Sequence, residues 1–456
     1  MPVPPALPAR QGHLHARGTA DGRISPRPLR GVPLRSGLPV TEPLVQVEDL
    51  TVHFPVKSNV LESLWRATQR QPAPIVHAVD GISFTVDRGE ILGLVGESGC
   101  GKTTTGRAVI RLLKPTGGRI RFEGADITNL EERELRPLRP RMQIVFQDPH
   151  AALNPTMTIG QSIQDPLLIH RQASEVEAKD ATLAAMEEVG LAPAPDLFDK
   201  YPADLSGGQK QRAVIARAMI LRPSLIVADE PVAMLDMSIR AKILELMLDL
   251  RKKHGLSYIL ITHDLATAKF MCDRIAIMYL GRIVEVGPAE AIYRDPKHPY
   301  TRALIAAIPV PEPGRARVST LPRGEVPDAV HPPAGCRFHP RCPAVLPTCG
   351  WEGRDFIEHL EQALLDPSRA SPAAKALGPV ERWSADGRSA WRDPLDLDAT
   401  RANALAKEVL GAAPAALAGA VQEAKVEDDR LHIVFRVPDP LPAKDVDGRV
   451  VECLLY

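Results

Sequence analysis

The chain lacks several features that mark common classes of protein. No apolar run approaches the roughly 18 to 20 residues that a membrane-spanning helix needs, and no apolar core of a secretion signal lies near the N-terminus. Only six of the 456 residues are cysteine, which fits a reducing compartment better than a disulfide framework. Lysine plus arginine and aspartate plus glutamate both number 56, so the net charge does not indicate nucleic acid as a partner. We therefore expect a soluble, cytoplasmic protein of two or three domains.

The most informative segment has the pattern Gly, four residues, Gly-Lys-Thr, which is that of a phosphate-binding P-loop. It lies between an apolar run of strand length, 91–95, and a stretch that predicts a helix, 102–113. Glycines let successive backbone N–H groups turn toward phosphate oxygens, and the helix N-terminus adds further donors. We expect Lys102 to reach the β- and γ-phosphates and Thr103 to ligate Mg²⁺. The predicted nucleotide-binding residues are Gly96, Glu97, Ser98, Gly99, Cys100, Gly101, Lys102, Thr103 and Thr104.

Two acids follow a second apolar run. Residues 225–228 predict a buried strand, and Asp229 and Glu230 come directly after it. In an open parallel sheet, ligands bind at the carboxyl ends of the strands, where the P-loop also lies. Because Mg²⁺ prefers oxygen ligands, Asp229 is predicted to serve the metal and Glu230 to polarise the attacking water.

A second anion-binding pattern opens another predicted helix, 209–221. It consists of Ser206, Gly207, Gly208 and Gln209, and a helix that begins this way presents free N–H donors. One triphosphate needs one such cradle. Two cradles in one chain predict that each serves a different nucleotide, one of them held by a partner subunit.

Residues 205–212 resemble the signature motif of the ATP-binding-cassette (ABC) ATPases. The rest of that family's pattern is present in order. The resemblance implies that Phe54 stacks on adenine, and that Gln147 contacts Mg²⁺ or water and couples to a transmembrane partner. It also implies that His263 acts near the γ-phosphate, as a catalytic residue beside Glu230 and Gln147.

The same resemblance implies that Asp236 binds across a cassette dimer. The family's D-loop commonly reads Ser-Ala-Leu-Asp, whereas residues 233–236 read Ala-Met-Leu-Asp. Loss of the serine hydroxyl predicts weaker communication across the dimer. It does not predict an inactive site, since Glu230, His263 and Ser206 are retained.

Strands that alternate with helices predict an α/β fold with a parallel core sheet. One of the helices has a capping box at Ser174 and Glu177. Resemblance to the ABC ATPases adds an antiparallel β-subdomain and a helical subdomain to this P-loop nucleotide-binding domain. Other predicted strands cover residues 45–54, 82–86, 119–122, 142–146 and 258–262.

The C-terminal region resembles the ATPase subunits of oligopeptide and dipeptide importers. The resemblance lies in residues 289–304 and 335–343 and in the last few residues of the chain, and it is closest to the second ATPase subunit of such systems. Within the cassette, residues 101–107 and 147–155 resemble the same subfamily.

Four cysteines belong to this Cys-bearing extension: Cys336, Cys342, Cys349 and Cys453. Four thiolates suit tetrahedral zinc or an iron–sulfur cluster. Some relatives carry a [4Fe–4S] cluster here, so the resemblance favours iron–sulfur, and ordinary reduced thiols are the third interpretation. Cys272 lies outside this group, and Cys100 belongs to the P-loop.

The predicted organisation has five parts. A segment rich in proline and arginine, 1–43, is expected to be disordered, and a mis-assigned start codon explains it equally well. The other parts are the nucleotide-binding domain 44–290 with a helical subdomain at about 148–222, the extension 291–350, an inserted subdomain 351–447 and a closing segment 448–456. Within the insertion we expect helices at 357–365 and 400–410 and a strand at 431–437. The insertion is either a decoration or a site of regulation or subunit contact.

The sequence thus predicts the ATP-binding and ATP-hydrolysing subunit of an ABC importer for peptides, at the cytoplasmic face of the cell membrane. Its cofactors are ATP and Mg²⁺. The implied partners are two membrane-spanning permeases, a second ABC ATPase subunit and, indirectly, an extracytoplasmic substrate-binding protein. The alternatives are an importer for nickel or another small solute and, from a different class, a soluble ABC ATPase that acts on nucleic acid or ribosomes.

Overall fold

The computed structural model describes residues 42–56, 73–308, 325–365, 371–393 and 396–456. The segment expected to be disordered, 1–43, falls outside these ranges except for its last two residues. No helix in the described ranges is both long and apolar enough to cross a membrane.

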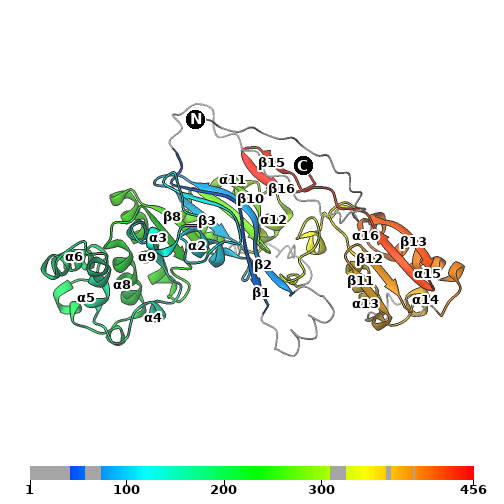
Figure 1. The fold of residues 1–456 in the computed structure, drawn as a ribbon, viewed down its shortest axis with the longest axis horizontal. Coiled ribbons are helices and arrows are strands. Elements are labelled where there is room, and N and C mark those ends of the chain that lie inside the picture. The colour runs from blue at the N-terminus through cyan, green and yellow to red at the C-terminus, as the bar shows by residue number, and fades with distance from the viewer. Residues whose placement is uncertain (1–41, 57–72, 309–324, 366–370, 394–395) are drawn as a thin grey trace, which may run out of the picture. The chain divides into compact units, whose positions relative to one another are not determined.

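The larger sheet is mixed and has eight strands, in the order β15-β16-β10-β9-β3-β8-β7-β6. Figure 1 labels β3, β8, β10, β15 and β16 of this sheet. The five strands from β9 to β6 are parallel, and the other three are antiparallel to their neighbours. The strands are β3 (Ile91–Val95), β6 (Met142–Val145), β7 (Leu225–Asp229), β8 (Ser257–Thr262), β9 (Arg274–Tyr279), β10 (Arg282–Pro288), β15 (Ala443–Val446) and β16 (Arg449–Glu452). The α/β fold is therefore confirmed.

Strand β3 shows how this sheet separates two hydrophobic cores. All five of its residues are buried, as expected for a central parallel strand covered on both faces. Successive side chains point to opposite faces, so Leu92 and Leu94 join one core while Ile91 and Val95 join the other. The first core also contains residues of the antiparallel sheet, and the second contains the helices of the other face.

The antiparallel β-subdomain has the order β2-β1-β4-β5. Its strands are β1 (Val45–Pro55), β2 (Ile75–Val86), β4 (Gly117–Phe122) and β5 (Ala125–Asp126). Val45 and Val47 face the core from β1 and pair in register with Val86 and Phe84 of β2. This alternation is what a half-buried strand requires.

Short helices connect β6 to β7 and form the helical subdomain. They are α4 (Pro149–Ala152), α5 (Ile159–Ile169), α6 (Glu175–Glu188), α7 (Ala194–Phe198) and α8 (Gly207–Met219). The capping box predicted at Ser174 and Glu177 is present. Helix α9 (Met237–His254), α10 (Leu265–Met271) and the short α3 (Glu132–Leu135) complete the cassette.

The helix after the P-loop is shorter than predicted. Helix α2 covers Lys102–Val109 and does not continue to residue 113. Arg111 has a left-handed backbone, with φ of 58°, and its guanidinium donates to the carbonyls of Ile127 (2.8 Å) and Leu130 (3.0 Å). These contacts with a loop 16 to 19 positions later hold Arg111 in a non-helical conformation. The helical pattern of the nearby sequence does not reveal them.

The chain after β10 is anchored to the core sheet. Helices α11 (Ala289–Arg294) and α12 (Pro299–Ala306) follow it. Between them, the N–H groups of Lys297 and His298 donate to the fully buried carboxylate of Glu285 on β10, at 3.0 and 2.9 Å. The extension is therefore built against the sheet and does not hang from it as a separate tail.

The predicted boundary between residues 447 and 448 is wrong. It divides the hairpin of β15 and β16, whose turn holds Asp447 and Gly448. Strand β16 pairs with β10, so both strands of the hairpin belong to the cassette sheet.

Residues 351–365, 371–393 and 396–435 form a small subdomain with a hydrophobic core of its own. Its sheet has the order β11-β12-β14-β13, with β11 (Trp383–Asp386), β12 (Ser389–Arg392), β13 (Val421–Glu427) and β14 (Arg430–Phe435). Its helices are α13 (Gly353–Leu365), α14 (Pro372–Ala376), α15 (Ala399–Ala412) and α16 (Ala415–Ala420). The predicted helices and strand are present as α13, α15 and β14 with shifted ends, and the sequence did not reveal β11, β12 and β13.

Candidate nucleotide site

The P-loop lies directly against two other backbone segments. A Cβ at Gly96 would come within 2.2 Å of the Met278 carbonyl oxygen, and one at Gly101 within 2.2 Å of the Ala78 carbonyl oxygen. Gly101 also has φ of 103°, which disfavours any other residue. Both glycines are therefore required by space, and the loop is held in a fixed place between β2 and β9.

Lys102 lies at the start of α2 with its side chain turned back over the loop. Its ammonium group donates to the carbonyls of Gly96 (2.9 Å) and Glu97 (2.8 Å), and only 5% of the residue is exposed. Carbonyl oxygens replace the water that burial has removed. A phosphate that enters the loop would take over these contacts.

A pocket of about 550 Å³ opens at this loop. In the described part of the chain, its walls come from the P-loop, from β2 and from the ends of β6, β7 and β8. They are Ala78, Ser98, Gly99, Gly101, Lys102, Thr103, Thr104, Gln147, Glu230 and His263. The structure thus brings most of the predicted phosphate-binding and catalytic residues to one cavity.

Thr103 and Asp229 form the pair that suits Mg²⁺. The Thr103 hydroxyl donates to Asp229 Oδ1 at 2.9 Å, and Asp229 is only 3% exposed. Burial raises the pKa of Asp229, although the Thr103 hydroxyl and nearby cations oppose this shift. A hard cation would stabilise the ionised carboxylate, so these two residues fit the metal that their sequence positions predict.

Glu230 projects its carboxylate between two partners from other strands. Gln147 Nε2 donates to Glu230 Oε2 at 3.0 Å, and His263 Nδ1 lies 3.1 Å from Glu230 Oε1. The backbone of Glu230 has φ of 46°, an uncommon conformation for a non-glycine residue. Its N–H nevertheless bonds to the Ile261 carbonyl at 2.9 Å. The neighbouring strand therefore holds the strained residue and aims its side chain along the pocket wall.

The remaining predicted residues lie outside the pocket wall. Cys100 is buried with its sulfur 3.8 Å from Lys102 Nζ, and burial raises the pKa of its thiol. Phe54 is partly exposed on β1, and Asp236 is exposed at the N-cap of α9. Gly96 and Glu97 do not line the pocket either, but their carbonyls accept from Lys102.

The signature residues are organised as a helix cap. Ser206 is the N-cap of α8; its hydroxyl accepts from the Gln209 N–H, and the Gln209 side chain accepts from the Ser206 N–H. Ser206 and Gly207 are exposed, and none of residues 206–209 lines the pocket in the described part of this chain. A nucleotide bound by the P-loop of this chain leaves its signature free.

Sequence reasoning missed the residues that hold Glu97. The side chain of Arg341 and the hydroxyl of Tyr300, both from the extension, bond to this P-loop residue. It also missed Ala78, whose carbonyl supports Gly101. More than two hundred positions separate Glu97 from Tyr300 and Arg341, and no spacing pattern spans such a distance.

The four cysteines of the extension lie near one another. Cys336, Cys349 and Cys453 are buried and Cys342 is partly buried. Burial raises the pKa of the Cys336 thiol, and Cys349, Cys453 and Cys342 raise it further. Among the described residues, however, no three of these sulfurs are as close together as the ligands of a single ion.

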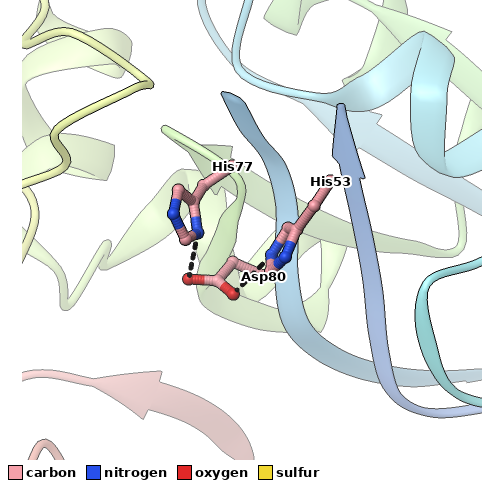
Figure 2. A group of neighbouring side chains, drawn as sticks. All are labelled: His53, His77 and Asp80. Carbon is pink, nitrogen blue, oxygen red and sulfur yellow. Dashed lines mark hydrogen bonds and ion pairs between the residues drawn. The ribbon is translucent and has the colours of Figure 1, made fainter. Parts of the chain in front are cut away.

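One other group in the described residues has spacing suitable for a metal: His53, His77 and Asp80, shown in Figure 2. His53 Nε2 lies 3.0 Å from Asp80 Oδ1 and His77 Nδ1 lies 3.7 Å from Asp80 Oδ2. The Arg337 guanidinium also contacts Asp80 Oδ2 and already neutralises the only carboxylate. A divalent cation would add two positive charges beside a largely buried arginine, so the group fits a charge-linked hydrogen-bond cluster better than a metal centre.

The mixed sheet, the antiparallel and helical subdomains and the pocket at the P-loop are those of an ATP-binding-cassette ATPase. Residues 79–233 match the family described as "ABC transporter", and residues 284–349 match the one described as "Oligopeptide/dipeptide transporter, C-terminal region".

Curated relatives extend this match over most of their own length. The probable peptide ABC transporter ATP-binding protein y4tS of Sinorhizobium fredii is 47% identical over 337 residues, 74% of this chain and 93% of that protein. The oligopeptide transport ATP-binding protein OppF of Escherichia coli is 45% identical over 309 residues, 67% of this chain and 90% of that protein. A solved dimeric structure of the cassette MJ0796 bound to ADP and Pi has 26% identity and a TM-score of 0.47, over 54% of this chain and 98% of its own. The chain belongs to the family of peptide ABC transporter ATP-binding proteins.

We expect Asp80 to make a pH-dependent contribution to stability. Burial alone would raise the pKa of Asp80, but Arg337 and His53 outweigh it, so the pKa lies below its ordinary value of 3.8. A depressed carboxyl pKa stabilises the fold above the ordinary pKa, and this stability is lost as the pH falls through the folded-state pKa. Asp80→Asn should destabilise the protein by about 1 to 3 kcal/mol at pH 7.

Urea unfolding of both proteins as the pH is lowered measures this effect. The difference between them should begin to shrink as the pH falls below the ordinary aspartate pKa of 3.8, and it should disappear once the pH is below the depressed folded-state pKa. A difference that stays constant across this range would contradict the assignment to the Asp80 charge.

Proposed function

We propose that this chain is the ATP-hydrolysing subunit of an importer for peptides and that it drives conformational change in separate permease subunits. The observation that carries the ATPase part is the position of Glu230 on the pocket wall, held between Gln147 and His263. Asp229 directly precedes Glu230 in the chain, and together with Thr103, its hydrogen-bond partner, it supplies the metal ligands.

Each side chain has a defined task in this proposal. The P-loop N–H groups and Lys102 bind the phosphates, and Thr103 and Asp229 hold Mg²⁺ either directly or through water. Glu230 aligns and deprotonates the attacking water, with Gln147 and His263 fixing its carboxylate. Hydrolysis then depends mainly on positioning and electrostatic stabilisation of the transferred phosphoryl group. Phe54 serves the adenine ring.

A second cassette completes the site. The signature, Ser206 to Gln209, begins with the exposed Ser206 and Gly207 and forms the N-terminal cap of a helix of 13 residues, which suits the γ-phosphate of a nucleotide bound elsewhere. Two cassettes that close head to tail would each add this cap to the other's P-loop, with Asp236 at the interface between them. The second cassette is either another copy of this chain or a related subunit.

The peptide part rests on the relatives and on the extension. Two named relatives are peptide or oligopeptide transport proteins, and the region that matches the oligopeptide/dipeptide family contains Glu285, His298 and Arg341. We assign the chain to the cytoplasmic face of a membrane, bound to two permeases that an extracytoplasmic binding protein supplies with substrate.

The four cysteines of the C-terminal region suit an iron–sulfur cluster. Cys336, Cys342, Cys349 and Cys453 would hold a [4Fe–4S] cluster, in which each sulfur binds a different iron atom. The sulfurs of such a cluster lie further apart than the ligands of one ion, because a cluster edge separates them. Four neighbouring thiols in a largely buried site support this choice over zinc.

Replacing the carboxylate of Glu230 should separate binding from hydrolysis. Glu230→Gln keeps the size of the side chain and an oxygen that can accept from Gln147. The amide, however, cannot accept a proton from water. We expect unchanged MgATP affinity and an ATPase rate lower by about 10²- to 10⁴-fold, measured as phosphate release and by calorimetric titration. Glu245→Gln on the exposed face of α9 is the matched control. Near-normal turnover in Glu230→Gln would remove Glu230 from this role.

Affinity purification from detergent-solubilised native membranes tests the transport assignment. A tagged chain should bring along two multi-span permeases and a second cassette, identified by mass spectrometry. Uptake of labelled peptides should then be lost in cells that carry only Glu230→Gln. Recovery with ribosomes or DNA-repair proteins, or a role in nickel or other small-solute uptake, would contradict the peptide assignment and leave the ATPase chemistry standing.

Iron and sulfide analysis after anaerobic purification tests the cysteine proposal. We expect about four iron and four sulfide per chain, with both lost in Cys336→Ser and retained in Cys272→Ser, since Cys272 lies outside the group. Zinc in place of iron, or neither metal, would refute the cluster.

A further inference from the structure

We propose that Arg341 and Tyr300 of the C-terminal extension are positioning residues for the P-loop, and that they set the affinity of the site for nucleotide through Glu97. This inference rests on the proposed ATPase function. It gives a role in nucleotide binding to the C-terminal extension, which none of the nucleotide-binding motifs includes.

Arg341 holds the side chain of Glu97 with two parallel bonds. Arg341 Nη1 lies 2.9 Å from Glu97 Oε2 and Nη2 lies 3.3 Å from Oε1. Such a two-pronged pair fixes orientation as well as distance. The Arg341 side chain is 9% exposed and that of Glu97 28%, so water screens this pair much less than an ion pair on the surface.

Tyr300 holds the backbone of the same residue. The Glu97 N–H donates to the Tyr300 hydroxyl at 3.0 Å, while the Glu97 carbonyl accepts from Lys102 Nζ at 2.8 Å. The extension therefore fixes both the side chain and the N–H of the residue whose carbonyl orients the phosphate-binding lysine. A shift of Glu97 would move that carbonyl and, with it, Lys102.

Packed rings keep these two contacts rigid. Tyr279 of β9, Tyr300 of α12 and Phe338 are all fully buried. Their ring centroids lie 4.7 Å (Tyr279–Tyr300), 5.2 Å (Tyr279–Phe338) and 5.3 Å (Tyr300–Phe338) apart, within the range of favourable aromatic pairs. The Tyr279 hydroxyl also accepts from Arg341 at 3.3 Å. The support behind Glu97 is thus part of the core and not a loose surface contact.

A second arginine of the same short segment, Arg337, contacts β2, the strand that lies against the P-loop at Gly101. Arg337 contacts the Asp80 carboxylate and the Leu280 carbonyl. Asp80 is two residues along β2 from Ala78, whose carbonyl lies against Gly101. Residues 336–342, which begin and end with a cysteine, therefore contact the P-loop directly at Glu97 through Arg341, and they contact the strand that supports Gly101 through Arg337.

A double-mutant cycle tests the proposal with ATP as the probe. In Arg341→Ala and Glu97→Ala we expect the KM for ATP and the Kd for MgATP to rise about 5- to 20-fold. At saturating ATP, the kcat of Arg341→Ala should change less than about twofold, because this substitution leaves Glu230 and its partners in place. The double variant should be no worse than either single variant, since both remove the same interaction. Arg341→Lys, which keeps the charge without the fork, should recover only part of the affinity.

Two measurements separate positioning from general damage to the fold. Arg354→Ala is the matched control, because Arg354 lies on α13 just beyond the extension and bonds to Glu352 and the His331 carbonyl and not to the P-loop; its KM should equal that of the wild type. Hydrogen exchange without nucleotide should be faster at residues 97–101 in Arg341→Ala and in Glu97→Gln, with unchanged exchange in α8. Glu97→Gln alters only a partly exposed side chain and keeps the test valid if Arg341→Ala folds poorly.

Unchanged KM and unchanged exchange in Arg341→Ala would overturn the inference, and so would additive effects in the double variant. If the wild-type chain binds no MgATP, the proposed function fails. The exchange comparison still judges the contact between the extension and the P-loop in that case.

Discussion

The parallel pairing of β3, β8 and β7 is the constraint on which the site depends. Val95 pairs with Thr262, and Ile261 pairs with Asp229, so the ends of three strands lie side by side. The P-loop leaves the first of these ends, His263 follows the second, and Glu230 follows the third. Because the register of a parallel sheet fixes these positions, the bonds from Glu230 to His263 and from Thr103 to Asp229 need no further device.

The extension is best regarded as part of the cassette. Glu285 on the core sheet accepts two N–H groups from the turn before α12, and α12 carries Tyr300 to the P-loop. Strand β16, almost at the end of the chain, adds to the same sheet next to β10. In the described part of the chain, the P-loop is therefore supported both by the cassette, at Ala78 and Met278, and by the extension, at Tyr300 and Arg341.

The sequence predicts what is local and what is repeated in the family. Apolar runs of strand length ended close to where β3, β7 and β8 end, and the P-loop, the paired acids and the capping box at Ser174 and Glu177 are short patterns with a direct physical cause. The failures share a different cause. Helix α2 stops early where Arg111 bonds to a loop 16 to 19 positions later, and the hairpin boundary was misplaced because β16 pairs with a strand more than 150 positions earlier. The contacts of the Glu97 side chain and N–H were missed because their partners, Arg341 and Tyr300, lie more than 200 positions away. Tertiary partners of this kind decide structure without leaving a pattern in the nearby sequence.

The nucleotide site also departs from the rules that the rest of the fold obeys. Asp229 is a buried carboxylate whose pKa burial raises, so its charged form is destabilised until a cation arrives. Lys102 is a buried ammonium group that carbonyl oxygens solvate, and Glu230 has a backbone conformation that few non-glycine residues adopt. Buried charges and strained backbone lower the stability of a fold. Their concentration around one pocket indicates selection for binding and chemistry over stability. MgATP would supply a cation for Asp229 and phosphate oxygens for Lys102. Binding would therefore offset the cost of burying the charges of Asp229 and Lys102. Because the extension already holds the P-loop rigid, little of the binding free energy is needed to order the loop, and more of it contributes to affinity.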